Sequence, residues 1–281
     1  MNENKITVQE ILTLKNKRKI TALTAYDYPL ADLIDKAGID IILVGDSVAN
    51  VVLGMESTTM IGMAEMLHHA KSVTRAVQHA LVIGDMPYES YQINPDKALK
   101  NAARFIDEAR CDAIKLEWFD KCLQVTKEII KAGIPVIGHI GLTPQTADKI
   151  GGFKVQGKDP ETANGLIEQA AELEKCGCFA IVLECIPDKI AQLITKKLKI
   201  PTIGIGAGLY CDGQVLVTHD LLGLFQRYKP KFVKQYINLS DLIQKAVQCY
   251  KQDVLEEKFP GKEHSFGISN DALKTLLESQ A

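Results

Sequence analysis

The chain has 281 residues, of which 46% are hydrophobic and 24% charged, and its formal net charge is −2 at pH 7. This length suits one α/β barrel, for which about 250 residues are typical. The near-neutral charge and the absence of a basic block argue against a nucleic-acid partner. No apolar run reaches the roughly 18 residues of a membrane span, so we expect no membrane partner either.

The seven cysteines indicate a reducing compartment. Their number is odd, and Cys111, Cys178 and Cys185 lie inside or beside apolar runs, as is usual for buried free thiols rather than for a disulfide framework. Residues 1–5 contain no apolar segment of the kind found in a secretion signal. We therefore predict a cytoplasmic protein.

Short apolar runs alternate with helical patterns along most of the chain. The eight runs that predict strands are 20–25, 40–45, 80–84, 112–116, 135–139, 179–183, 201–205 and 215–218. The helical patterns between them are 30–37, 63–77, 95–109, 122–132, 160–175 and 188–198. Eight strands that alternate with helices predict a (β/α)8 TIM barrel.

An open, doubly wound sheet is the alternative fold. Such a sheet usually carries a glycine fingerprint after its first strand, but the turn at 25–28 reads AYDY and contains no glycine. The long connection at 140–159, which is rich in glycine, follows the fifth strand, and connections of this length are often functional. We expect a barrel whose active site this connection covers.

Chemically active side chains stand where several of these strands end. Asp46, Asp85, Glu117 and Glu184 each close an apolar run, and His139 closes another. One such acid alone could be a helix N-cap, but five strand ends of a barrel meet at one face, where active sites lie. Converging carboxylates repel one another unless a cation joins them, and oxygen ligands suit Mg²⁺. The pattern predicts a metal-assisted enzyme.

Lys115 and Ser47 are further candidates for this face. Lys115 lies two residues before Glu117 in a strand, so both side chains point to the same side. It could bind an anionic substrate, offset the carboxylates, act as a Schiff-base amine, or extend its ammonium group to solvent. Ser47 follows Asp46 and could donate to a substrate carboxylate or simply cap a helix.

Ordered motifs along the chain resemble those of the ketopantoate hydroxymethyltransferase family. They are TAYD at 24–27, LVGDS at 43–47, KLE at 115–117, GHIGLTPQ at 138–145, KVQG at 154–157, LECIP at 183–187, IGIGAG at 203–208 and PGKEHSF at 260–266. The resemblance covers residues 8 to 266. We therefore expect one barrel domain with an N-terminal helix at 1–266 and a C-terminal extension of unknown role at 267–281.

The resemblance implies a specific fold group and reaction. Members of this family are (β/α)8 barrels related to the phosphoenolpyruvate mutase and isocitrate lyase group, and they commonly form decamers. They transfer a one-carbon unit from 5,10-methylenetetrahydrofolate to C3 of 3-methyl-2-oxobutanoate. The product, ketopantoate, serves pantothenate and coenzyme A synthesis. The implied partners are these two small molecules and further copies of the chain.

The resemblance also assigns roles to the candidate residues. Asp46 and Asp85 correspond to direct Mg²⁺ ligands, and Glu117 to an acid that holds the metal site through water. The residues that correspond to contacts with the oxo acid are Asp46, Ser47, Asp85, Lys115 and His139. Glu184 corresponds to the catalytic base. Two other interpretations of the sequence remain open. The chain could be a Mg²⁺-dependent 2-oxo-acid lyase of the same barrel group, or a ring-forming scaffold protein whose active site has lost its function.

Overall fold

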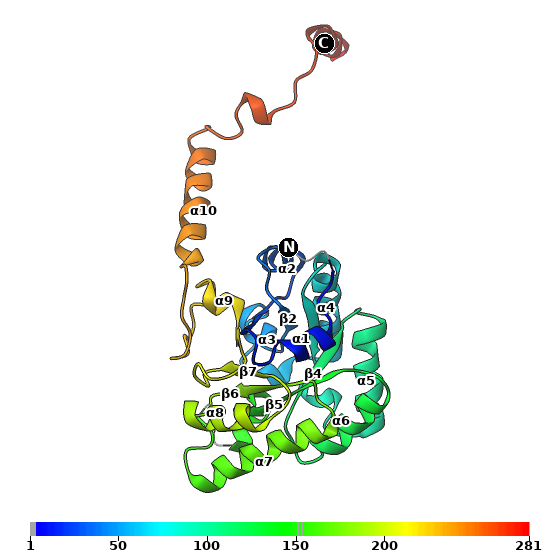
Figure 1. Cartoon of the computed structure of the whole chain (residues 1–281). Coiled ribbons are helices and arrows are strands. Elements are labelled where there is room, and N and C mark those ends of the chain that lie inside the picture. The colour runs from blue at the N-terminus through cyan, green and yellow to red at the C-terminus, as the bar shows by residue number, and fades with distance from the viewer. Residues whose placement is uncertain (1–3, 151, 153, 281) are drawn as a thin grey trace.

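The computed structural model describes residues 4–150, 152 and 154–280, and Figure 1 shows a barrel wrapped in helices with an arm that leaves it. Every strand is parallel to its neighbours, and the eighth pairs with the first, which closes the barrel. The strands are β1 (Ile20–Thr24), β2 (Ile41–Val44), β3 (Leu81–Asp85), β4 (Ala113–Glu117), β5 (Val136–Gly141), β6 (Ala180–Glu184), β7 (Thr202–Ile205) and β8 (Gly213–Leu216). The prediction of a (β/α)8 barrel is confirmed.

Helices cover the outside of the barrel and continue beyond it. The longer ones are α1 (Val8–Leu14), α2 (Tyr28–Lys36), α4 (Met63–Ala76), α5 (Pro95–Asp107), α6 (Cys122–Lys131), α7 (Pro160–Cys176), α8 (Asp188–Lys197), α10 (Leu239–Leu255) and α11 (Asn270–Ser279). The short ones are α3 (Val48–Val51), α9 (Thr218–Leu221), η1 (Thr58–Met60), η2 (Tyr88–Ser90), η3 (Pro144–Ile150) and η4 (Lys262–His264). Among the described helices, none combines the length and hydrophobicity needed to cross a membrane.

Two apolar clusters explain why the strands read as unbroken hydrophobic runs. The inner cluster fills the barrel, with Ile20, Leu81 and Ile137 among its members, and Ile11 of α1 packs onto it. The outer cluster lies between the strands and the surrounding helices and includes Phe105 of α5. The strands from β2 to β7 therefore bury both faces, which is the usual arrangement in a parallel sheet, whereas Thr21 of β1 and Gln214 of β8 are exposed.

A glycine lets α5 lie close to β3. A Cβ atom placed on Gly84 would lie 2.4 Å from Cδ1 of Phe105, a separation that real Cβ atoms do not reach. The Phe105 ring is fully buried. Only glycine fits at this point of the strand, one residue before Asp85.

The last strand begins and ends two residues earlier than expected. Residues 215–218 were predicted, whereas β8 runs from Gly213 to Leu216 and pairs Gly213 with Ile20. Gly213 is a poor strand residue by propensity, but a Cβ there would lie 2.5 Å from the Ile20 carbonyl oxygen. Thr218 already belongs to α9, and its backbone N–H donates to Oγ1 of Thr24 at 3.0 Å.

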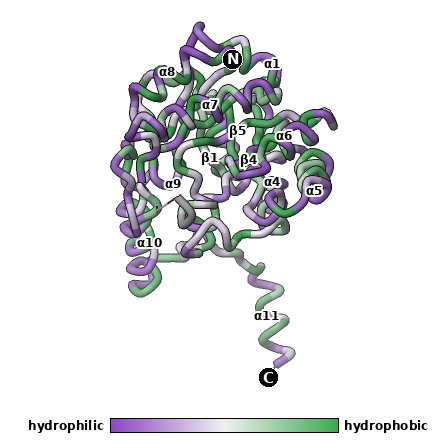
Figure 2. Tube along the Cα trace, turned by 90° about the horizontal axis from the view of Figure 1, so that it is seen from below, coloured by the Kyte–Doolittle hydropathy of each residue, from purple (hydrophilic) through white to green (hydrophobic). Residues whose placement is uncertain are grey.

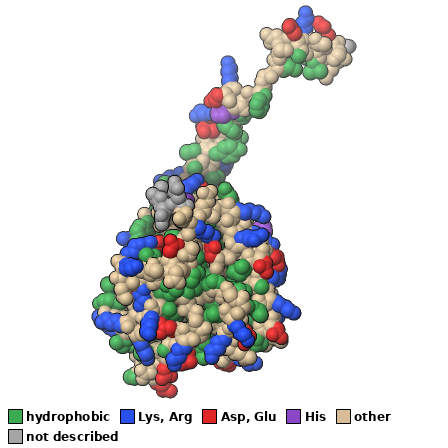
Figure 3. All heavy atoms as spheres, turned by 45° about the vertical axis from the view of Figure 1, so that its right-hand side comes forward, with side chains coloured by type: hydrophobic (Ala, Val, Ile, Leu, Met, Phe, Trp, Pro, Cys, Tyr) green, Lys and Arg blue, Asp and Glu red, His purple; other side chains and the backbone are tan. Residues whose placement is uncertain are grey.

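Helix α10 starts an arm that extends away from the barrel (Figures 1 and 2). Ile243, Val247, Tyr250 and Val254 are each at least 43% exposed, and their spacing of four, three and four residues places them on one helix face. Figure 3 shows hydrophobic side chains along the protruding arm. The domain boundary expected after residue 266 lies within this arm and stays a prediction.

Candidate active site

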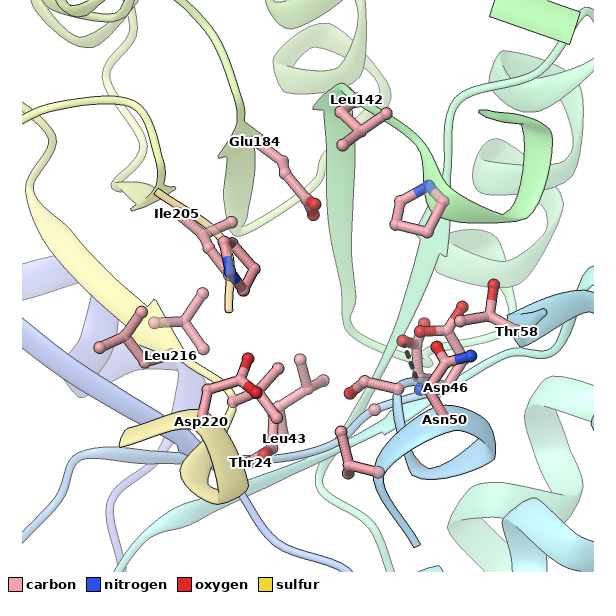
Figure 4. Close-up of a pocket in the computed structure, with 18 of the residues that line it drawn as sticks. Thr24, Leu43, Asp46, Asn50, Thr58, Leu142, Glu184, Ile205, Leu216 and Asp220 are labelled. Carbon is pink, nitrogen blue, oxygen red and sulfur yellow. Dashed lines mark hydrogen bonds between the residues drawn. The ribbon is translucent and has the colours of Figure 1, made fainter. Parts of the chain in front are cut away.

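All seven predicted site residues line one cavity of about 610 Å³. Figure 4 shows this cavity, with Asp46 and Glu184 among the labelled residues. Asp85, Glu117 and Glu184 end strands β3, β4 and β6, while Lys115 and His139 lie inside β4 and β5. Asp46 and Ser47 follow β2 directly. Because the carboxyl ends of parallel strands meet at one mouth of the barrel, residues far apart in the sequence reach the same space.

An ion pair joins β3 to β4 at the floor of the cavity. Nζ of Lys115 donates to both carboxylate oxygens of Asp85 at 2.8 Å, and it lies 3.8 Å from Oε1 of Glu117. The backbone N–H of Asp46 donates to Oδ2 of Asp85 at 3.1 Å. Lys115 is only 4% exposed, so its ammonium group offsets buried carboxylates and does not extend to solvent.

The electrostatics of this group follow from burial. Burial raises the pKa of Asp85 to about 7, and repulsion from Asp46 and Glu117 adds to this effect, while Lys115 opposes it. Burial also raises the pKa of Glu117. For Lys115 burial disfavours the charged form, but the attraction of Asp85 and the other carboxylates outweighs it and raises the pKa. The site thus holds more negative charge than Lys115 alone neutralises.

Gln145 and Tyr91 complete this network, although neither is among the site residues predicted from the sequence. Nε2 of Gln145 donates to Oδ2 of Asp46 at 2.9 Å, and its backbone N–H donates to Oε2 of Glu117 at 3.0 Å. The hydroxyl of Tyr91 donates to Oε1 of Gln145 at 2.6 Å. Gln145 lies in the long connection after β5 and is the last residue of the GHIGLTPQ motif, which could have indicated its role. Tyr91 follows a short 3-10 turn, and no motif in the sequence indicates its role.

His139 lies between two carboxylates. Its Nε2 atom is 3.2 Å from Oε2 of Glu184, and its Nδ1 atom is 3.5 Å from Oε1 of Glu117. Burial and the charge of Lys115 disfavour the imidazolium, but the two carboxylates prevail and raise the pKa of His139 to about 9. His139 therefore holds Glu184 toward the cavity, and Figure 4 shows the Glu184 carboxylate pointing into it.

Ser47 is not a helix cap. It occupies the N-cap position of α3, yet its side chain makes no capping hydrogen bond. Instead its Oγ lies 2.7 Å from the hydroxyl of the buried Tyr26. This pairing orients the Ser47 hydroxyl at the cavity wall, so the capping interpretation left open by the sequence is wrong.

The carboxylates fit a magnesium ion better than a metal that needs a full set of protein ligands. Within the described residues, no group of three or more His, Cys, Asp or Glu side chains could hold a metal ion. Mg²⁺, however, usually binds one or two carboxylates and completes its shell with water and substrate oxygens. Oε1 of Glu117 is buried without a hydrogen-bond donor in the described structure, as suits an acid that contacts water in such a shell.

Sequence comparison decides the family. The sequence model described as ketopantoate hydroxymethyltransferase matches residues 5–262. The chain belongs to the ketopantoate hydroxymethyltransferase family. It is 53% identical over 262 residues to the 3-methyl-2-oxobutanoate hydroxymethyltransferase of Syntrophomonas wolfei, covering 93% of this chain and 95% of that relative. The enzyme of the same name from Syntrophobacter fumaroxidans is 52% identical and covers 98% of this chain and 97% of its own length.

Solved structures place this family member in a wider fold group. Phosphoenolpyruvate phosphomutase from Streptomyces platensis subsp. rosaceus superposes with a TM-score of 0.61 at 14% identity, covering 98% of this chain and 95% of that chain. The 2,3-dimethylmalate lyase, a member of the PEP mutase/isocitrate lyase superfamily, gives 0.58 at 11% identity, covering 98% and 99%. At such identities the likeness shows a shared fold alone, and that fold is the barrel that the motifs implied.

Proposed function

We propose that the chain transfers a hydroxymethyl unit from 5,10-methylenetetrahydrofolate to C3 of 3-methyl-2-oxobutanoate with the help of Mg²⁺. Family membership supports the activity, and the convergence of all seven motif residues on one cavity is the observation that carries it. The overall reaction consumes one water: oxo acid, methylenetetrahydrofolate and water give ketopantoate (2-dehydropantoate) and tetrahydrofolate. It is the step that feeds pantothenate and coenzyme A synthesis.

Asp46 and Asp85 are the residues that would hold Mg²⁺ directly, with Glu117 one water away. Their negative charge exceeds that of Lys115, and burial, followed by repulsion from Asp46 and Glu117, raises the pKa of Asp85. When bound, the ion would act as a Lewis acid that neutralises the carboxylates and stabilises negative charge on the keto oxygen. Gln145 keeps Asp46 in place through its 2.9 Å hydrogen bond.

The oxo acid would be held from three further directions. Lys115 supplies a buried positive charge for the carboxylate or keto oxygen of the substrate, and Ser47 offers a hydroxyl that Tyr26 orients at 2.7 Å. His139, whose pKa is raised, would add a second buried positive charge beside the substrate, while its two ring nitrogens face Glu184 and Glu117. A small anion with two adjacent oxygen groups matches this arrangement of donors.

Glu184 is the residue we assign to the proton at C3. Its carboxylate reaches the cavity from β6, on another strand than Asp46 and Asp85, and it is only 14% exposed. It accepts the C3 proton on a carboxylate oxygen, while His139 fixes its position from 3.2 Å. The electron pair left at C3 then forms the new bond to the one-carbon unit. The two bonds from this carbon to the folate nitrogens break, water supplies the hydroxyl group, and the nitrogens take up the proton from C3 and one from water.

The lyase alternative has less support. Proteins of that activity share the barrel with this chain at 11% identity, which shows the fold alone. Relatives that are 52% and 53% identical over almost the whole chain carry the transferase name. No cysteine lies between residues 140 and 160, where a nucleophilic thiol would favour a lyase.

An oligomer and a cytoplasmic location complete the proposal. The apolar face of α10, formed by Ile243, Val247, Tyr250 and Val254, is exposed in the single chain, and exposed apolar stripes of this kind usually meet a partner. The family resemblance favours a decamer of identical chains. All seven cysteines are free, as is typical of a reducing compartment.

Glu184→Gln tests the chemistry, because glutamine keeps the shape of the side chain and removes its basic oxygen. The wild-type enzyme should exchange the C3 proton of 3-methyl-2-oxobutanoate into D₂O with Mg²⁺ and without folate, as NMR can follow. A general base contributes about 10² to 10⁴ in rate, so the variant should lose at least two orders of magnitude while its oxo-acid affinity is unchanged. The exposed Glu161→Gln in α7 is the matched control.

Two results would contradict this assignment. If Glu184→Gln exchanges the proton at the wild-type rate, another group is the base. If the wild-type enzyme neither exchanges the proton nor forms ketopantoate from the two substrates, the proposed reaction itself is wrong. Mass measurement of the products separates these two cases.

A further inference from the structure

The β8 side of the cavity carries a carboxylate that the proposed chemistry leaves unused. Asp220 lies in α9, directly after β8, and lines the same cavity as the acids of β2, β3 and β4. Figure 4 shows its side chain pointing into the cavity from the side of Leu216 and Leu43, with Asp46 across the open space. It therefore faces the oxo-acid site from the opposite wall.

Asp220 has no partner in the part of the chain that the structure describes. Its side chain makes no hydrogen bond or ion pair there, although it is only 9% exposed. Burial raises its pKa to about 6, and no neighbouring group contributes to this shift. A buried carboxylate without donors is costly unless a ligand supplies them. A ligand that brings a pair of N–H groups would satisfy both oxygens.

The cavity is larger than the oxo acid requires. Its volume of about 610 Å³ is that of a site for a drug-sized ligand, whereas the first substrate has five carbons. Phe225 and Phe232, from the segment after α9, line the same cavity as Asp220. Apolar and aromatic walls of this kind suit a flat ring system.

Two contacts hold the segment after α9 against other parts of the barrel at the cavity. Nη1 of Arg227 donates to the carbonyl of Gly54 at 3.1 Å, which joins this segment to the loop after α3. The ring of Phe232 lies against Gly206, where a Cβ would come within 2.8 Å of it. The segment after α9 thus forms part of the cavity wall beside the proposed oxo-acid site, and the cavity stays partly open to solvent.

We propose that Asp220 binds the pterin ring of the one-carbon donor. The 2-aminopyrimidin-4-one part of a reduced pterin carries an N3–H and a 2-amino group side by side, and this donor pair matches the two oxygens of one carboxylate. Phe225 and Phe232 would flank the ring system. This inference rests on the proposed function, since it names how the second substrate of that reaction is held.

The Asp220→Asn variant separates the binding of methylenetetrahydrofolate from the proton transfer at C3. Asparagine keeps the size of the side chain but replaces one accepting oxygen by a donor, which opposes the pterin N–H groups. We expect the KM for methylenetetrahydrofolate to rise by about 10- to 100-fold, as the loss of hydrogen bonds to a charged group implies. Folate-independent exchange of the C3 proton should stay within about twofold of wild type. Asp96→Asn, exposed in α5, is the charge-matched control.

An experiment on the wild-type enzyme avoids any effect of mutation on folding. The 2-desamino-2-methyl analogue of tetrahydrofolate lacks one donor of the pair, so wild type should bind it at least tenfold more weakly than tetrahydrofolate, by calorimetry. The Asp220→Asn variant should discriminate less between the two. An unchanged KM in the variant, or equal binding of both ligands by wild type, overturns the inference.

Loss of C3 exchange together with turnover in Asp220→Asn also overturns the inference, because it would make Asp220 part of the proton-transfer machinery. Failure of the wild-type enzyme to use methylenetetrahydrofolate at all would instead reject the proposed function. Exchange, turnover and binding are measured separately, so these outcomes are distinguished.

Discussion

Gly84→Ala should destabilise the barrel at the strand that carries Asp85. The added Cβ would lie 2.4, 2.9 and 3.0 Å from three atoms of the Phe105 ring. The ring is fully buried and cannot swing into solvent, and β3 is held by β2 and β4 on either side. Overpacking of this kind costs about 1–3 kcal/mol, and about 2 kcal/mol lowers the Tm of a domain of this size class by about 4–8 °C.

Thermal unfolding at fixed protein concentration, followed by circular dichroism, measures this effect. Gly165→Ala in α7 is the control, because a Cβ there meets nothing within 4 Å and alanine is the better helix former. Its Tm should be equal to wild type or higher. Phe105→Leu should recover part of the loss when combined with Gly84→Ala, so that the two changes are not additive. If Gly84→Ala melts like the control, or if the two changes are additive, the added Cβ does not clash with the Phe105 ring.

Two further predictions concern the metal and the arm. Alanine at Asp46 or Asp85 should abolish ketopantoate formation at ordinary Mg²⁺ and restore part of it at high Mg²⁺ or with Mn²⁺, and full wild-type activity in EDTA would reject the metal site. Light scattering should give the wild-type chain a mass of at least twice 31.0 kDa. The double variant Val247→Asp with Tyr250→Asp, which places two charges on the apolar face of α10, should have a lower mass. A wild-type monomer would refute this role of α10.

The sequence predicted the strands from β2 to β7 well, because their burial on both faces leaves continuous apolar runs. It was less accurate at β8, where Gly213 and Gln214 pair with β1 although neither is a typical strand residue. Propensity is a poor guide there, since the close approach of Ile20 decides which residue fits. Helix α10 was not predicted, because no strand follows it to complete a β/α repeat.

The candidate site was predictable for a related reason. Acids that end buried strands are visible as breaks in apolar runs, and the geometry of a parallel barrel brings such ends together. Gln145 and Tyr91 occupy irregular segments, where no periodicity indicates which way a side chain points. Their contacts with Asp46 and Glu117 depend on the path of the chain between strands, which one sequence does not reveal.

The pairing of β1 with β8 has a consequence for how the protein is made. The hydrogen bond from Thr218 to Thr24 joins residues 194 positions apart, so it forms only after nearly all of the barrel has left the ribosome. Until then β1 and β7 are open sheet edges that can pair with other chains, and contacts of such long range form slowly. Asp220 enters the cavity only when this closure occurs, so the barrel and its active site are completed by the same late event.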